Sequence, residues 1–216
     1  MDSIIQNIAI YALPVIFAIT LHEAAHGYVA KHFGDLTAYT QGRVSLNPIK
    51  HIDLVGTILL PLVTLWLGGI LFGWAKPVPV NFSALRRPKQ DMLWVALAGP
   101  GANLFMALLW GLVIKLGLGM SESDLADPMI LMGEAGIKIN VILMVLNLLP
   151  LPPLDGGRVA VSLLPHRMAN SFARIEPYGF MILVFLLVTG VLGAVIGPFI
   201  VITIRMVAWF FGFEAY

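Results

Sequence analysis

The chain has 216 residues, of which 59% are hydrophobic and 12% charged, with a formal net charge of +1. Its mean hydropathy is +0.90. A soluble domain carries about a quarter charged residues, so this composition excludes an ordinary soluble protein and predicts one membrane-embedded, all-α domain over residues 1–216. The near-neutral charge gives no argument for a nucleic-acid partner. The absence of cysteine excludes disulfides and thiolate ligands, so any metal would be held by His, Asp, Glu or Asn.

Apolar stretches follow one another along the chain, at about 4–30, 55–74, 92–118, 130–149 and 178–211. A membrane crossing needs about 20 apolar residues, and its backbone groups must pair internally. We therefore expect a polytopic helix bundle of about five to six apolar segments in the lipid bilayer. Gly197 and Pro198 interrupt the last stretch, which predicts one span followed by a second span or an interfacial helix over 198–212. The N-terminus lacks the basic residues and cleavage site of a signal peptide, so we expect the first stretch to be retained.

The first stretch contains the H-E-x-x-H pattern, with His22, Glu23 and His26. Residues four apart lie on one helix face, so both imidazoles can bind one zinc ion. Glu23 lies beside that face, where it can take a proton from a metal-bound water. A chance match is the alternative, but ionisable groups in a membrane span are costly unless they have a function. The pattern therefore predicts a hydrolytic metal site.

A catalytic zinc needs three protein ligands and an open position, so a third ligand must come from elsewhere. Asp155 is the best candidate, since it follows an apolar helix and a proline-rich break and precedes two glycines. An ordinary turn at the membrane surface would explain the same pattern. His51 and Asp53 are rival ligands, although an N-cap role suits Asp53 equally well. His32 lies beyond the motif, where it is expected to face the lipid headgroups.

Three asparagines lie within apolar stretches. Asn103 follows Gly99 and Pro100, while Asn140 and Asn147 are seven residues apart and so share one helix face. Hydrogen bonding between helices is one role for such residues. Substrate binding or oxyanion stabilisation beside the metal is the other.

In chain order, the motifs His22-Glu23-x-x-His26, Gly99-Pro100-x-x-Asn103 and Asn147-x-x-Pro150-x-Pro152-x-x-Asp155-Gly156-Gly157 resemble those of the site-2 protease family. Members are intramembrane zinc metalloproteases that cut transmembrane or membrane-proximal protein substrates. The resemblance covers roughly residues 10–160, and the apolar residues 178–212 follow it. It implies one Zn²⁺ held by His22, His26 and Asp155, with Glu23 as catalytic base.

A further stretch, Gly42-Arg43-x-x-Leu46-Asn47-Pro48-x-x-His51-x-Asp53, resembles a compact bacterial and archaeal subgroup of the same family. Such a protein is expected in the cell membrane as a multi-pass protein. The chain has no room for the PDZ or nucleotide-sensing domain of many relatives.

If the two motifs meet at one metal, their helices must run parallel, and the chain between them must cross the membrane an odd number of times. The Gly- and Pro-broken stretch 55–74 is then expected to re-enter rather than span. This arrangement places basic residues on one side, which predicts a cytosolic active site. They are Lys31, Arg43, Lys50, Lys76, Arg86, Arg87, Lys89, Arg158, Arg167 and Arg174.

The sequence therefore predicts an endopeptidase in which zinc activates a water and Glu23 transfers its proton. Asn103, Asn147 and Asn140 are candidate substrate-binding or oxyanion residues. Intramembrane His, Glu and Asp also occur in transporters and channels, although no inverted repeat is visible here. An inactive family member that only binds membrane proteins is a third hypothesis.

Overall fold

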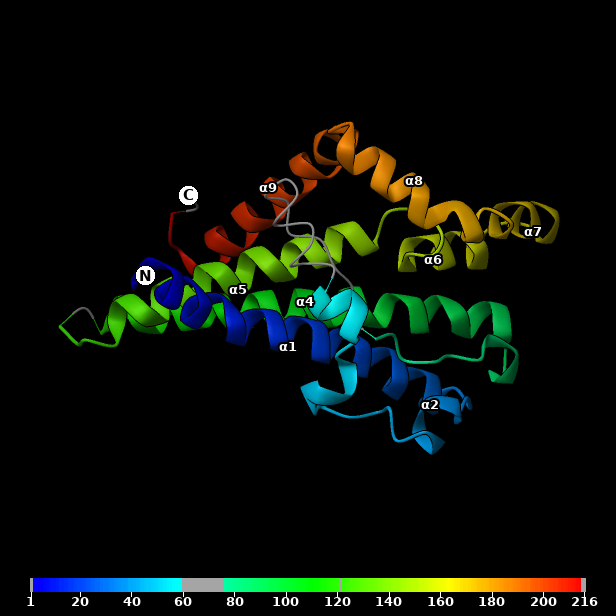
Figure 1. Ribbon diagram of the computed structural model, residues 1–216, viewed down its shortest axis with the longest axis horizontal. Helices are drawn as coiled ribbons and strands as arrows, with labels where there is room; N and C mark the ends of the chain where they lie inside the picture. Colours follow the sequence, from blue (N-terminus) through cyan, green and yellow to red (C-terminus); the bar gives the residue numbers. More distant parts are fainter. Residues whose placement is uncertain (1, 60–75, 121, 215–216) are drawn as a thin grey trace.

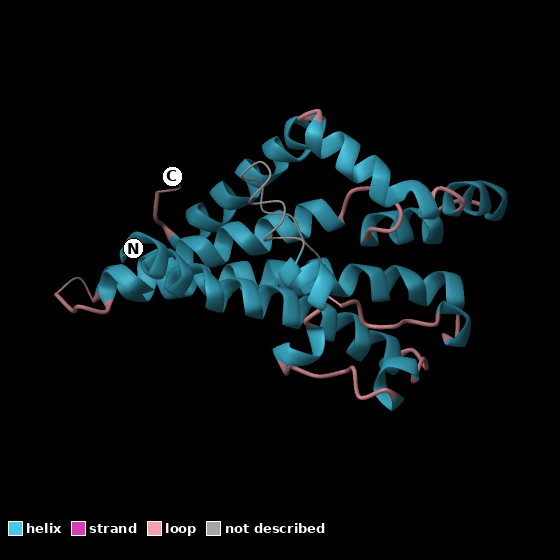
Figure 2. Cartoon of the chain, in the orientation of Figure 1, coloured by secondary structure: helices cyan, strands magenta, loops and turns pink. Residues whose placement is uncertain are grey.

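The computed structural model describes residues 2–59, 76–120 and 122–214, and within them the regular structure is entirely helical (Figure 2). Three long helices form the centre: α1 (Asp2–His32), α4 (Pro88–Gly119) and α5 (Ala126–Asn147). They lie side by side, with α1 and α5 running in one direction and α4 in the other (Figure 1). The expected helix bundle is confirmed, and the helices that carry the two motif regions are parallel.

Two glycines set the close packing of α5 on α4. A methyl group built on Gly136 would lie 2.2 Å from Cγ of Trp110, and one on Gly133 would lie 2.4 Å from Cγ1 of Ile114. Small residues let neighbouring membrane helices approach until their side chains interlock. Trp110 and Ile114 belong to the main buried cluster, together with Val141 of α5.

After α5 the chain forms α6 (Asp155–Leu163), α7 (His166–Ala173), α8 (Glu176–Val188) and α9 (Val191–Phe211). The break in the last apolar stretch falls at Gly190, whose φ of 76° ends α8, whereas Pro198 lies inside α9. The expected division at Gly197 and Pro198 is therefore wrong. A left-handed glycine terminates a helix readily, while a membrane helix can accommodate a proline.

Together, α8 and α9 pass once from one end of the bundle to the other (Figure 1). The end of α9 returns to α4, since a methyl group on Gly111 would lie 2.6 Å from the ring of Phe211. Residues 198–211 therefore continue α9 rather than form a helix of their own.

Four helices in the described ranges are long and apolar enough to cross a membrane: Ala9–His32, Pro88–Gly119, Ala126–Asn147 and Val191–Phe211. The pair α7 and α8, bent by 62°, would add a fifth if it forms one span. The stretch 55–74 lies mostly outside the described residues, which include only its start, in the π-helix η2 (Leu54–Leu59). Its re-entry stays a prediction.

Residues 33–53 and 76–86 lie along the C-terminal half of α1 and include α2 (Thr37–Thr40), η1 (Pro48–His51) and η3 (Phe82–Ala84). The buried carboxylate of Asp35 links the two segments. It accepts a hydrogen bond from the backbone N–H of Thr37 at 2.9 Å and another from that of Asn81 at 2.7 Å. The N–H of Arg86 also donates to the carbonyl of Phe33. The segment that begins at residue 76 is thereby held beside the H-E-x-x-H helix.

Candidate metal centre

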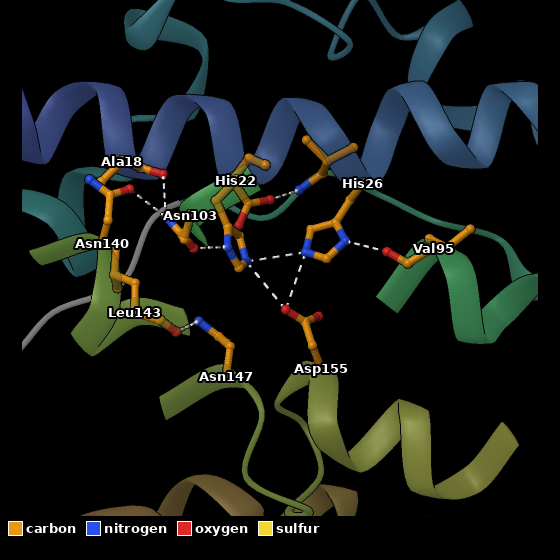
Figure 3. A network of polar contacts seen from close by, with 11 residues as sticks. Ala18, His22, His26, Val95, Asn103, Asn140, Leu143, Asn147 and Asp155 are labelled. Carbon is orange, nitrogen blue, oxygen red and sulfur yellow. Dashed lines mark hydrogen bonds and ion pairs between the residues drawn. The ribbon is translucent and has the colours of Figure 1, made fainter. Parts of the chain in front are cut away.

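Two imidazoles and one carboxylate converge between α1 and α6 (Figure 3). Nε2 of His22 and Nε2 of His26 are 3.1 Å apart, and Oδ2 of Asp155 lies 3.3 Å from each. All three residues are buried. Within the described residues they are the group of His, Asp and Glu side chains whose ligand atoms lie close enough to share one ion.

Hydrogen bonds on the far side of each ring determine which nitrogen faces the cluster. Nδ1 of His22 lies 2.6 Å from Oδ1 of Asn103, and Nδ1 of His26 lies 2.7 Å from the carbonyl of Val95. Both oxygens are acceptors, so each Nδ1 carries the hydrogen and each Nε2 presents a lone pair. Partners of this kind orient metal-binding imidazoles.

The donor set fits a zinc ion. Bonds of about 2.0 to 2.1 Å in a tetrahedral site place ligand atoms about 3.3 Å apart, and these three atoms lie 3.1 to 3.3 Å apart. Oδ2 of Asp155 is buried without a hydrogen-bond partner, which a cation would explain.

Glycines bring the backbone close to the cluster. A methyl group on Gly99 would lie 2.4 Å from Nε2 of His26 and 2.6 Å from Nε2 of His22. Methyl groups on Gly156 and Gly157 would lie 2.3 Å from the carbonyl oxygen of Leu148 and 2.4 Å from the nitrogen of Pro152, respectively. The glycines after Asp155 thus let α6 begin directly against the proline-rich turn, which places the carboxylate at the imidazoles.

The three asparagines differ in their surroundings (Figure 3). Asn103 is fully buried, and its Nδ2 donates to the carbonyl of Ala18 at 3.2 Å and to Oδ1 of Asn140 at 3.0 Å. Asn140, also fully buried, donates to the carbonyl of Gly136 at 2.8 Å. The half-buried Asn147 donates to the carbonyl of Leu143 within its own helix at 3.0 Å.

Glu23 is half-buried and follows the first metal-site histidine directly. Its Oε2 accepts the backbone N–H of Val78 at 2.7 Å. The rival ligands lie outside the cluster: His51 is buried with Nε2 2.8 Å from the carbonyl of Ser45, and Oδ1 of Asp53 accepts the N–H groups of Val55 and Gly56. Val95 and Val78 were not among the residues that the sequence predicted. Each contacts the site through a backbone group, so the type of its side chain gives no sign of this role.

A bundle of membrane helices around a buried His-His-Asp cluster with an adjacent glutamate defines the class of membrane-embedded metallopeptidases. The sequence profile described as Peptidase family M50 matches residues 118–190. The chain is 39% identical over 189 residues to "Putative zinc metalloprotease YwhC" of Bacillus subtilis. The aligned region covers 86% of this chain and 83% of that relative.

The chain is also 34% identical over 201 residues to "Putative zinc metalloprotease Rip2" of Mycolicibacterium smegmatis, with 92% of this chain and 71% of the relative covered. For Rip2 of Mycobacterium tuberculosis the identity is 32% over 200 residues, with 90% and 67% covered. No solved structure matches the chain. The chain belongs to Peptidase family M50, the site-2 protease family, so the resemblance of its motifs is confirmed.

Proposed function

We propose that the chain is a zinc-dependent intramembrane endopeptidase that hydrolyses transmembrane or membrane-proximal segments of other proteins. The observation that carries this proposal is the buried cluster of His22, His26 and Asp155, with Glu23 beside it, inside a bundle of membrane helices. The proposal that the metal is zinc rests on the relatives, which are described as zinc metalloproteases.

In the proposed mechanism, the Nε2 atoms of His22 and His26 and the carboxylate of Asp155 hold the ion. Bound zinc polarises a carbonyl and lowers the pKa of a coordinated water to about 7. Glu23 accepts the proton of the attacking water and returns it to the leaving amine. Asn103 and the carbonyl of Val95 keep the imidazoles in the required tautomer and orientation.

We propose different roles for the three asparagines, because their side chains differ in burial. Because Asn103 and Asn140 are fully buried and their amide groups bond each other, their arrangement supports a positioning role. Asn147 is half-buried, and its hydrogen bond lies within its own helix, so it is the better candidate to bind a substrate carbonyl. A helical substrate must unwind locally, because each carbonyl in a helix is otherwise paired with an N–H four residues on.

The cytosolic side is proposed for the active site. The end of α1, the start of α4, and helices α6 and α7 lie at one end of the bundle, while the N-terminus, the α4–α5 turn and the C-terminus lie at the other (Figure 1). Arg87, Lys89, Arg158 and Arg167 belong to the first end, which favours its cytoplasmic orientation.

Replacement of Glu23 with glutamine tests the proposal. The variant should keep one zinc per chain, because Glu23 is not a ligand, and lose at least about 100-fold in cleavage rate, since general-base catalysis contributes about 10² to 10⁴. Zinc is measured by mass spectrometry of the purified protein. Cleavage is measured with fluorescein-labelled casein and with a single-span peptide in proteoliposomes.

Glu122→Gln, at an exposed acidic residue of the α4–α5 turn, is the matched control and should retain activity. His22→Ala should lose both zinc and cleavage. Full activity of Glu23→Gln would refute the catalytic role. If the wild type bound zinc but cleaved neither substrate, the result would favour the hypothesis of an inactive family member that only binds membrane proteins. If ions entered the vesicles, the result would favour the transporter hypothesis.

A further inference from the structure

The stretch from Gly42 to Asp53 contributes no ligand to the metal cluster, yet it folds as a compact unit. Gly42 has φ of 63°, and its carbonyl accepts Nζ of Lys50 at 2.8 Å. Asn47 caps η1 through the N–H of Ile49. His51 is buried, with its ring 2.8 Å from the carbonyl of Ser45. A loop held together at this many points can serve as a rigid support for another segment.

The segment that this loop supports is Lys76–Val78. The N–H of Lys76 donates to the carbonyl of His51 at 2.9 Å. Nη2 of Arg43 donates to the carbonyl of Lys76 at 2.9 Å and to that of Pro77 at 3.0 Å. One terminal nitrogen of a guanidinium has two hydrogens, so it can serve two successive carbonyls at once.

The last residue of the segment Lys76–Val78 contacts Glu23. The N–H of Val78 donates to Oε2 of Glu23 at 2.7 Å, a distance typical of a hydrogen bond to a charged acceptor. The fit against α1 is tight, because a methyl group on Gly27 would lie 2.9 Å from Cγ2 of Val44 and 3.2 Å from Cγ1 of Val78. Arg43 is thus connected to Glu23 through two backbone carbonyls and one amide.

We propose that Arg43 is a positioning residue for Glu23: it fixes Lys76–Val78 so that the Val78 amide restrains one carboxylate oxygen and leaves the other to the reacting water. This inference rests on the proposed role of Glu23 as the base. A restrained base acts on the chemical step, because a catalytic group displaced by about 1 Å can cost about 100-fold in rate. The Arg43 side chain bonds the carbonyls of Lys76 and Pro77 and none of the three residues of the metal cluster, so zinc content should not change.

Amide hydrogen exchange tests the connection without any need for activity. Pro77 and Pro79 have no amide hydrogen, so Val78 carries the single exchangeable amide of residues 77–79. Loss of a hydrogen bond to a charged group should speed exchange at Val78 about tenfold to a hundredfold in Arg43→Ala. Glu23→Ala, which leaves the loop intact, should give the same acceleration. Arg167→Ala is the matched control, since it also removes one guanidinium but at an exposed position of α7, outside the loop, and it should leave Val78 protected.

Kinetics with fluorescein-labelled casein give the second readout. Arg43→Ala should lower kcat about tenfold to a hundredfold, with KM within about twofold and zinc content unchanged. Arg43→Lys should recover part of kcat, because the ammonium keeps the charge and can donate to a carbonyl, but it ends a side chain one atom shorter than that of arginine. Arg167→Ala should keep the kcat of the wild type.

Several results would overturn the proposal. They are unchanged Val78 exchange in Arg43→Ala or Glu23→Ala, a raised KM with normal kcat, and loss of zinc in both Arg43 variants. If the wild type cleaved nothing, the proposed function would fail, but the exchange of Val78 would still decide whether Arg43 positions Glu23.

Discussion

A single methyl group at Gly99 should abolish zinc binding. In Gly99→Ala, Cβ would lie 2.4 Å from Nε2 of His26 and 2.6 Å from both Nε2 and Cε1 of His22. Carbon and nitrogen atoms that are not bonded need about 3.4 Å, so the ring of His26 must move by about 1 Å and that of His22 by about 0.8 Å, unless α4 itself shifts. Metal–ligand distances tolerate only about 0.2 Å.

We expect the zinc affinity of Gly99→Ala to fall by more than about 100-fold, beyond the effect of removing a ligand's hydrogen-bond partner. Gly101→Ala is the matched control, because it lies in the same helix and its methyl group meets nothing within 4 Å. Both substitutions favour the helix by a similar amount, about 1 kcal/mol, so their difference isolates the clash. Zinc competition with a fluorescent chelator measures the affinity, and thermal unfolding in detergent checks the fold. Zinc binding by Gly99→Ala at the wild-type affinity would refute the placement of α4 against the two histidines.

Two further substitutions test the surroundings of the site. Asn103→Leu should weaken zinc binding about 10- to 100-fold, because Nδ1 of His22 loses its acceptor; the same competition assay should find no change in Asn147→Leu, and equal affinities in the two variants would contradict this role. Gly136→Ala should destabilise the protein by about 1 to 3 kcal/mol, because its methyl group would lie 2.2 Å from Trp110. Thermal unfolding measures that loss, and an unchanged midpoint relative to Gly193→Ala, whose methyl group meets nothing within 4 Å, would argue against close α4–α5 packing.

The features that the sequence predicted well depend on local geometry. His22 and His26 are four residues apart in one helix, so the helix alone brings their side chains to one face. The apolar stretches 4–30, 92–118 and 130–149 became α1, α4 and α5, since lipid requires internal pairing of every backbone group. The break in the last stretch was misplaced because Pro198 is an obvious signal, whereas the left-handed conformation of Gly190 is not visible in its residue type.

The sequence by itself determined a membrane helix bundle, a pair of imidazoles on one helix face and an adjacent glutamate, because each follows from composition or from spacing within one helix. Only the tertiary structure decided that Asp155 rather than His51 or Asp53 faces the imidazoles, since that depends on how α6 packs against α4, which in turn packs against α1. It also placed Asn103, 81 residues from His22 along the chain, on the far side of that ring. Helix packing sets contacts over such separations, and the backbone groups of Val95 and Val78 take part through no property of their side chains.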